Sequence, residues 1–186
     1  MFKLDKRKIR RKLSPSKNFF LSLAGSIIYQ QISTKAGDAI YAKFLRLFGR
    51  KKPNPESFLS ISAPNLRLAG LSPQKISYLK DLAEKFIDKT INPEFIPKMS
   101  DDEVKEHLVR VKGIGSWTAD MFLIFALNRQ NILPVGDLGI KKGFQKVFGL
   151  KKLPEERKMR ILAKPFEGER THLSLYLWDT INGDKN

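Results

Sequence analysis

The sequence predicts an all-α fold, and three observations support this prediction. Nearly every periodic segment repeats its apolar residues at intervals of three and four, which is the spacing of an amphipathic helix. No convincing run alternates polar and apolar residues as a half-buried strand would. Glycine, proline and serine signals separate the segments at typical helix starts and ends. With 186 residues, 41% hydrophobic residues and 13 Phe, the chain can form one domain or two small helical lobes around a filled core.

The helices expected before the central motif are bounded by recognisable capping signals. Thr34 is expected to cap the second helix and Gly49 to end it. Ser72 followed by Pro73 opens a later helix, and Ser100 with Glu103 forms a capping box. In chain order, these expected helices cover residues 16–32, 34–49, 58–69, 72–87 and 100–111.

The remaining helices are expected over residues 116–127, 137–148, 154–163 and 169–181. The KKPNP segment at 51–55 is interpreted as a turn, because helical patterning resumes directly after it. We therefore expect a basic leader over residues 1–13 and one helical domain over residues 14–186. That domain would contain two helical subdomains and a hairpin at about residues 108–118.

The charge of the chain favours a nucleic-acid partner. Lys and Arg number 35 against 19 Asp and Glu, which gives a formal net charge of +16 and a pI near 10.1. A solvated basic surface, as in ribosome-associated or heat-adapted proteins, is the alternative reading of the same charge. The absence of cysteine excludes disulfides and thiolate metal sites, and two histidines are too few for a metal site of their own. The apolar runs are too short for a membrane span, and the basic N-terminus has no secretory core, so we expect a soluble, untargeted protein.

The most informative stretch reads VKGIGSWTADMFLIFALNRQNILPVGDLGIKKG, from Val111 to Gly143. Gly113 and Gly115 flank Ile114 between two helical runs, so the backbone can turn tightly and expose N–H groups to an anion such as a DNA phosphate. Lys112 adds positive charge to the same turn. A glycine at a helix end is also a common C-cap, which is the structural alternative for this turn.

Asp137 stands directly before the basic segment LGIKKGF. An aspartate in this position is typical of a helix N-cap, and the same cap would hold the carboxylate in a fixed place for catalysis. Lys141 and Lys142 follow one helical turn later and could contact phosphates, although they also fit an ordinary surface.

Four aromatic residues are candidates for a pocket that stacks on a base: Trp117, Tyr29, Tyr176 and Trp178. A tryptophan is more often part of a core than a ligand platform, so burial is the alternative for each.

The motif GIGSWTAD followed by LPVGDLGIKKG closely resembles the helix-hairpin-helix (HhH-GPD) DNA glycosylase superfamily, and specifically its 3-methyladenine DNA glycosylase II family. Upstream, IIYQQISTKAGDAI and LRLAGLSPQKISYLKDLA resemble further segments of that family, and LSLYLW resembles its closing helix. The resemblance covers roughly residues 16–180 in the same order, which is more specific than one motif alone.

The resemblance implies two helical lobes around a cleft, a hairpin that grips one strand of duplex DNA, and a flipped damaged nucleotide. By motif position, Asp137 matches the catalytic aspartate. Trp117 occupies the place where bifunctional relatives carry a Schiff-base lysine, which implies excision without strand cleavage. The implied activity is base excision repair of alkylated purines such as 3-methyladenine and 7-methylguanine, by hydrolysis of the N-glycosidic bond.

The resemblance also implies the binding residues and partners. The implied base pocket comprises Trp117, Met121, Tyr29, Tyr176 and Trp178. The expected DNA contacts are Lys112, Gly113, Ile114, Gly115, Ser116, Lys141 and Lys142. We also expect Gln30 or Gln31, and the neighbourhood of residues 65–68, to contact the minor groove. No cofactor is expected to be required, although a monovalent or divalent ion on the carbonyls of Val111 and Gly113 would match relatives. We expect a monomer that acts on damaged duplex DNA and does not bind membranes, located in the cytoplasm with the nucleoid or in a nucleus.

Three departures from the family pattern bear on these expectations. Met121 replaces an aromatic residue, Gly136 replaces an acidic neighbour of Asp137, and the N-terminal β-rich domain of larger relatives is missing, which suggests a minimal form. Two rival functions stay open at this point. One is a glycosylase for uracil, a mismatched base or an oxidised base, and the other is a non-catalytic helix-hairpin-helix module that only binds DNA.

Overall fold

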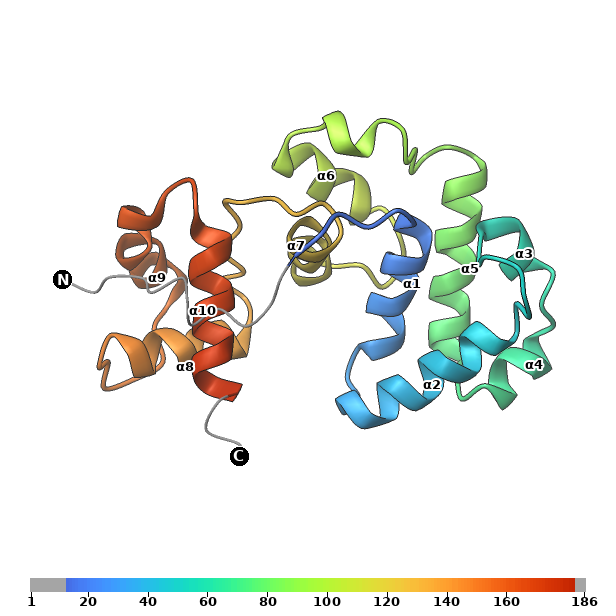
Figure 1. The fold of residues 1–186 in the computed structure, drawn as a ribbon, viewed down its shortest axis with the longest axis horizontal. Helices are drawn as coiled ribbons and strands as arrows, with labels where there is room; N and C mark the ends of the chain where they lie inside the picture. The colour runs from blue at the N-terminus through green and yellow to red at the C-terminus, as the bar shows by residue number, and fades with distance from the viewer. Residues whose placement is uncertain (1–12, 183–186) are drawn as a thin grey trace. The chain divides into compact units, whose positions relative to one another are not determined.

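The computed structural model describes residues 13–182, and these residues form two compact helical units. One unit comprises Ser16–Phe122, and the other contains residues 123–182 together with the short segment 13–15. The boundary falls inside helix α7. Residues 13–182 contain no strand, which confirms the all-α prediction (Figure 1). All of the predicted basic leader except Leu13 lies outside the described residues.

The N-terminal unit is built from six complete helices, a short 3₁₀ turn and most of α7. Its helices are α1 (Phe19–Tyr29), α2 (Thr34–Arg46), α3 (Pro55–Leu59), α4 (Ala63–Leu68), α5 (Pro73–Ile87), the 3₁₀ turn η2 (Ile96–Lys98), α6 (Asp101–Leu108) and α7 (Ser116–Phe125). Thr34 is the first residue of α2 and not its cap as expected. Ser33 lies one position outside the helix in an extended conformation, and its side chain accepts the N–H of Ala36 at 3.3 Å.

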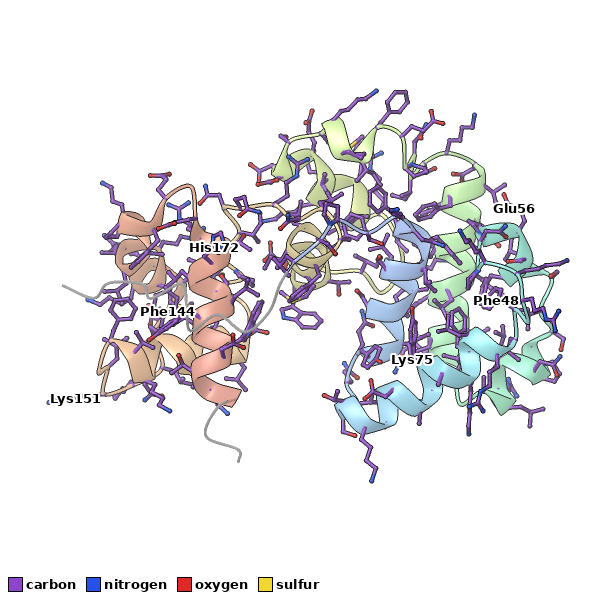
Figure 2. All side chains as sticks on the ribbon, viewed as in Figure 1. Phe48, Glu56, Lys75, Phe144, Lys151 and His172 are labelled. Atoms are coloured by element: carbon purple, nitrogen blue, oxygen red, sulfur yellow. The ribbon has the colours of Figure 1, made fainter. Side chains whose placement is uncertain are left out.

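The core of this unit lies where α1 packs against α2 and α5. Phe20 on α1 contacts Phe58 on α3, with ring centroids 6.1 Å apart, and Phe86 on α5, at 5.7 Å. Phe44 on α2 contacts Phe58 at 6.1 Å and Phe48, which Figure 2 labels, at 5.2 Å. The phenylalanines therefore tie four helices to one core, and α1 is central to it.

Residues 58–69, expected to continue one helical pattern, instead end α3 and form α4. Pro64 is in the first turn of α4, and its ring cannot be accommodated inside a continuing helix. Ser62 caps the new helix by accepting the N–H of Asn65 at 3.4 Å. The break leaves Leu68 at the end of α4 with 79% of its surface exposed.

Helices α6 and α7 are the two arms of the hairpin. The predicted capping box at the start of α6 is confirmed: Ser100 accepts the N–H of Glu103, and Glu103 accepts the N–H of Ser100 at 2.7 Å. Lys105 on α6 lies 2.8 Å from the carboxylate of Asp120, a buried residue on α7. This ion pair joins the two arms across the turn.

The C-terminal unit is a smaller helical assembly in which α8 packs against α10. Its complete helices are α8 (Leu138–Val147), α9 (Glu156–Leu162), the 3₁₀ turn η3 (Lys164–Phe166) and α10 (Arg170–Asn182). The core residues of this unit, among them Phe144 labelled in Figure 2, are Val135, Ile140, Phe144, Met159, Ala163, Phe166, Leu173 and Leu177.

Gly143 allows the close approach of α8 and α10. A Cβ at this position would lie 2.7 Å from the Cβ of Leu177 and 3.0 Å from its carbonyl oxygen. Because the obstacle includes backbone atoms, Gly143→Ala should lower the free energy of unfolding by about 1–3 kcal/mol. Thermal melting measures this loss, with Gly136→Ala as the control because a Cβ there meets nothing within 4 Å among the described residues. Equal melting temperatures for the two variants would contradict the close packing described.

Candidate active site and nucleic-acid interface

The hairpin between α6 and α7 depends on the backbone freedom of Gly113. Gly113 has φ +79°, in the left-handed region, and a Cβ on it would overlap the ring of Tyr78 on α5. Ile114 is only 4% exposed, and its N–H donates to the carbonyl oxygen of Val111 at 3.1 Å. The side chain of Ile114 therefore anchors the turn in the fold and is not available to a ligand, so residue 114 could contact one only through its backbone.

Two polar side chains from other helices hold the hairpin. Gln30, at the end of α1, donates its amide to the carbonyl oxygen of Gly113 at 2.8 Å and to the hydroxyl of Thr118 at 3.3 Å. Asp81 on α5 accepts the backbone N–H of Lys112 at 2.8 Å, and the ammonium of Lys112 lies 3.8 Å from the same carboxylate. The turn is thus fixed before any ligand arrives, which favours binding that needs a defined backbone.

The hairpin offers a group of backbone donors. Within residues 13–182, the N–H groups of Gly113, Gly115 and Ser116 have no hydrogen-bond acceptor. Ser116 begins α7, so its N–H lies at the positive end of a helix dipole. A Cβ on Gly115 would meet no described atom within 4 Å, so this face of the turn is open. Open donors of this kind suit a phosphate.

Asp137 is the N-cap of α8, as the sequence predicts. Its Oδ1 accepts the N–H of Ile140 at 2.8 Å. The same oxygen accepts the indole N–H of Trp178 on α10, also at 2.8 Å. Two donors on one oxygen fix the orientation of the carboxylate, which is the condition for a catalytic group that must act at one place.

The contact between Asp137 and Trp178 has its own support. Phe125 stacks on the indole, with ring centroids 5.9 Å apart. A Cβ on Gly139 would lie 2.9 Å from Cδ1 of Trp178 and 3.0 Å from Oδ1 of Asp137. A side chain at position 139 would therefore push the indole away from the carboxylate.

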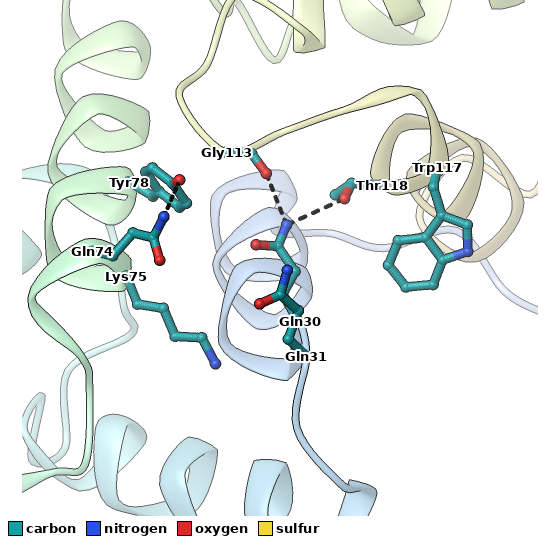
Figure 3. Close-up of a pocket in the computed structure, with 8 residues that line it drawn as sticks. All are labelled: Gln30, Gln31, Gln74, Lys75, Tyr78, Gly113, Trp117 and Thr118. Carbon is teal, nitrogen blue, oxygen red and sulfur yellow. Dashed lines mark hydrogen bonds between the residues drawn. The ribbon is translucent and has the colours of Figure 1, made fainter. Parts of the chain in front are cut away.

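A pocket of about 450 Å³ lies in the N-terminal unit beside the hairpin (Figure 3). Trp117, 42% exposed in the first turn of α7, forms one wall, and Tyr78 on α5 contributes a second ring. The full lining is Gln30, Gln31, Gln74, Lys75, Tyr78, Gly113, Trp117 and Thr118.

Lys75 brings a cation to this pocket. Its ammonium donates to the carbonyl oxygen of Ile28 at 2.6 Å, near the end of α1. Burial lowers the pKa of Lys75, because the charged form loses part of its hydration. Gln31, at the rim, is a non-glycine residue with φ +56°, and strained positions of this kind are often found at functional sites.

The other predicted site residues have different surroundings. Tyr29 packs over Gly37 and donates to the carboxylate of Asp38 at 2.6 Å, which raises the pKa of Tyr29 to about 12. Tyr29 does not line the pocket beside Trp117. Met121 on α7 and Tyr176 on α10 are partly buried, as is Lys141 on α8, whereas Lys142 is exposed.

The sequence patterns do not identify several residues of this site. Asp81, Tyr78 and Lys75 all lie on α5 and reach the hairpin or its pocket. Their spacing of three residues was visible as a second, polar face of that helix, but the sequence contains no local signal that this face meets residues 112 and 113.

The fold is that of a known class of proteins. The chain belongs to the HhH-GPD superfamily of base excision DNA repair proteins, which matches residues 24–167. It is 35% identical over 163 residues to DNA-3-methyladenine glycosylase 1 of Schizosaccharomyces pombe, covering 85% of this chain and 70% of that protein. It is 38% identical over 151 residues to the DNA-3-methyladenine glycosylase of Saccharomyces cerevisiae, covering 77% and 51%.

A solved structure agrees with these relatives. The S. pombe 3-methyladenine DNA glycosylase in complex with abasic DNA superposes with a TM-score of 0.84 at 32% identity, over 92% of this chain and 85% of that chain. The chain spans only 56% of the putative DNA-3-methyladenine glycosylase of Bacillus subtilis and 51% of the S. cerevisiae enzyme. The family resemblance noted from the motifs is therefore confirmed.

Proposed function

We propose that this protein is a monofunctional DNA glycosylase that excises alkylated purines from duplex DNA. The observation that carries the proposal is Asp137, a carboxylate held at the head of α8 by two N–H donors in a chain of this family. The relatives named as DNA-3-methyladenine glycosylases support alkylated purines as the substrate class.

The chemistry requires a carboxylate and little else. A purine alkylated at N3 or N7 carries positive charge and leaves as a neutral base, so it needs no general acid. As the glycosidic bond breaks, positive charge develops on the sugar, and Asp137 stabilises this oxocarbenium-like state. Water then adds to C1′ and loses a proton, which gives an abasic sugar and a free base. Trp117 has no amine, so no Schiff base forms there and the strand stays intact.

DNA binding is assigned to the hairpin and its neighbours. The open N–H groups of Gly113, Gly115 and Ser116 would bind a phosphate, and Lys112 would add charge. Lys141 and Lys142 would contact phosphates from α8. The strained Gln31 and the exposed Leu68 are the proposed contacts in the minor groove.

The base pocket is assigned to Trp117, Met121, Tyr176 and Trp178. Flat and polarisable side chains accept several cationic purines by stacking. We leave Tyr29 out, because its ring packs over Gly37 and its hydroxyl binds Asp38.

The remaining assignments concern ions, partners and location. We propose that no cofactor is required and that a monovalent or divalent ion binds the carbonyls of Val111 and Gly113, each of which accepts one hydrogen bond and has a second lone pair. No helix in residues 13–182 is long and apolar enough to cross a membrane. We propose a monomer that acts wherever the genome lies, in the cytoplasm with the nucleoid or in a nucleus.

The direct test is to incubate the purified protein with methylated duplex DNA. We expect release of free methylated purines, measured by chromatography, and no strand breaks until alkali is added. Undamaged duplex of the same sequence is the control. DNA binding without base release from methylated, uracil-containing or oxidised DNA would instead indicate a binding module.

Trp178→Phe tests whether the indole N–H of Trp178 positions the carboxylate of Asp137. Phenylalanine retains a ring for stacking on Phe125 but removes the N–H that holds Oδ1. We expect the single-turnover rate of base release to fall about tenfold with little change in DNA affinity, because a hydrogen bond to a charged group is lost. Gly139→Ala should slow the same step by displacing the indole. A normal rate in both variants would show that this contact does not position the carboxylate.

A further inference from the structure

Three side chains on one face of α10 bind the chain between α7 and the first turn of α8. Thr171, Ser174 and Trp178 follow one another at spacings of three and four residues, so they project from the same side of the helix. Trp178 binds the carboxylate of Asp137 itself. Thr171 and Ser174 bind the chain earlier, and they are only 1% and 0% exposed. Their burial means that these hydroxyl groups serve the interior of the C-terminal unit.

Thr171 and Ser174 hold both backbone groups of Ile132. The hydroxyl oxygen of Thr171 accepts the N–H of Ile132 at 3.0 Å, and the same hydroxyl donates to the carbonyl oxygen of Arg129 at 2.6 Å. The hydroxyl of Ser174 donates to the carbonyl oxygen of Ile132, also at 3.0 Å. Ile132 is 3% exposed and belongs to no helix, so the two hydroxyl groups supply the partners that a buried backbone requires.

The segment from Ile132 to Asp137 is short and rigid. The ring of Pro134 fixes one backbone angle, and the N–H of Asp137 donates to the carbonyl oxygen of Pro134 at 3.0 Å, which closes a turn. Val135 is buried in the core of the C-terminal unit. A displacement of Ile132 would therefore be passed on to the carboxylate, because no flexible stretch lies between them to absorb it.

We propose that Thr171 and Ser174 are positioning residues for Asp137, so that α10 fixes the carboxylate at two levels. Trp178 orients the carboxylate directly, whereas the two hydroxyl groups fix the backbone from which it projects. Both hydroxyl groups bind backbone atoms and act through Asp137 alone. Their effect on base release rests on the proposed function, whereas their effect on the bond between Asp137 and Trp178 does not.

Thr171→Val keeps the shape of the side chain and leaves the N–H of Ile132 without its acceptor. In single-turnover assays with methylated duplex DNA, we expect base release to slow at least about tenfold while the dissociation constant for the duplex changes less than about twofold, because a misplaced group affects the chemical step. Thr171→Ser keeps the hydroxyl and should release bases within about twofold of the parent rate. Ser174→Ala should slow the same step as Thr171→Val does.

The indole N–H of Trp178 reports the place of the carboxylate without catalysis. The chain contains two tryptophans, and Trp178→Phe identifies which ¹⁵N–¹H indole signal belongs to residue 178. Thr171→Val should shift this signal, because the hydrogen bond to Asp137 changes in length, whereas Thr171→Ser should leave it in place. Thr180→Val is the matched control, since the hydroxyl of Thr180 donates to the carbonyl oxygen of Tyr176 on its own helix. This control should change neither the rate nor the signal.

The outcomes separate the positioning role from the proposed function. If the parent releases no base but Thr171→Val shifts the indole signal, the hydroxyl positions the carboxylate and the proposed function is wrong. If the parent is active, the positioning role requires both effects, so an unchanged signal or an unchanged rate in Thr171→Val contradicts it. Equal effects in Thr171→Ser or Thr180→Val also contradict it, because the hydroxyl at 171 is then not the cause. Should Thr171→Val fail to fold, Ser174→Ala decides by the same two measurements.

Discussion

Asp137→Asn should slow the release of methylated purines by about a hundred- to a thousandfold while the variant folds and binds DNA as the parent does. The carbonyl oxygen of asparagine can still accept the N–H groups of Ile140 and Trp178, so the cap of α8 and the position of the side chain are kept. The substitution removes only the negative charge that, in the proposed mechanism, stabilises the developing charge on the sugar.

The measurement is a single-turnover assay of base release from methylated duplex DNA, beside a binding titration with the same duplex. Glu155→Gln is the matched control, since it removes one carboxylate at the N-cap of α9, where that side chain makes no capping bond. If Asp137→Asn releases bases at the rate of the parent, another group performs the chemistry.

Gly113→Ala should damage the hairpin more than any other single methyl group added there. The residue must keep φ +79°, and its new Cβ would overlap the ring of Tyr78. We expect the free energy of unfolding to fall by about 2–4 kcal/mol and the dissociation constant for duplex DNA to rise at least about tenfold.

Denaturant unfolding and DNA titration measure the two effects separately. Gly115→Ala is the control two residues away, because its Cβ would meet no described atom within 4 Å. That variant should unfold within about 1 kcal/mol of the parent. If Gly113→Ala matches the stability and affinity of the parent, the hairpin does not need the left-handed residue.

The local features of the fold were predictable from the sequence, because they involve residues close together in the chain. Ser100 and Glu103 are three positions apart, and so are Asp137 and the N–H that it caps. Thr34 was mistaken for a cap because Ser33, one position earlier, satisfies the same sequence rule. A break in the predicted helix over 58–69 was signalled by Pro64 and was overlooked.

The long-range contacts of the site were not predictable in this way. Trp178 and Asp137 are 41 residues apart, and Asp81 and Lys112 are 31 apart, so no periodic pattern links them. The sequence indicated that Trp178 belonged to the site by resemblance, but its bond to the carboxylate depends on how α10 packs on α8. The same packing requires Gly139 to lack a side chain.

In the proposed mechanism, Asp137 combines two functions that proteins commonly assign to different residues. Functional residues often lower the free energy of unfolding, so replacing them can make a protein more stable. Here the carboxylate caps α8 and places a negative charge at the positive end of the helix dipole, so the proposed activity and the fold would require the same residue. Variants that lose the cap, such as Asp137→Leu, should fail by lost abundance as well as by lost activity. Serine, threonine and asparagine can also cap a helix, so these substitutions at position 137 should yield well-folded proteins without activity. In a genetic screen they would form a small set of variants with normal abundance and no repair activity.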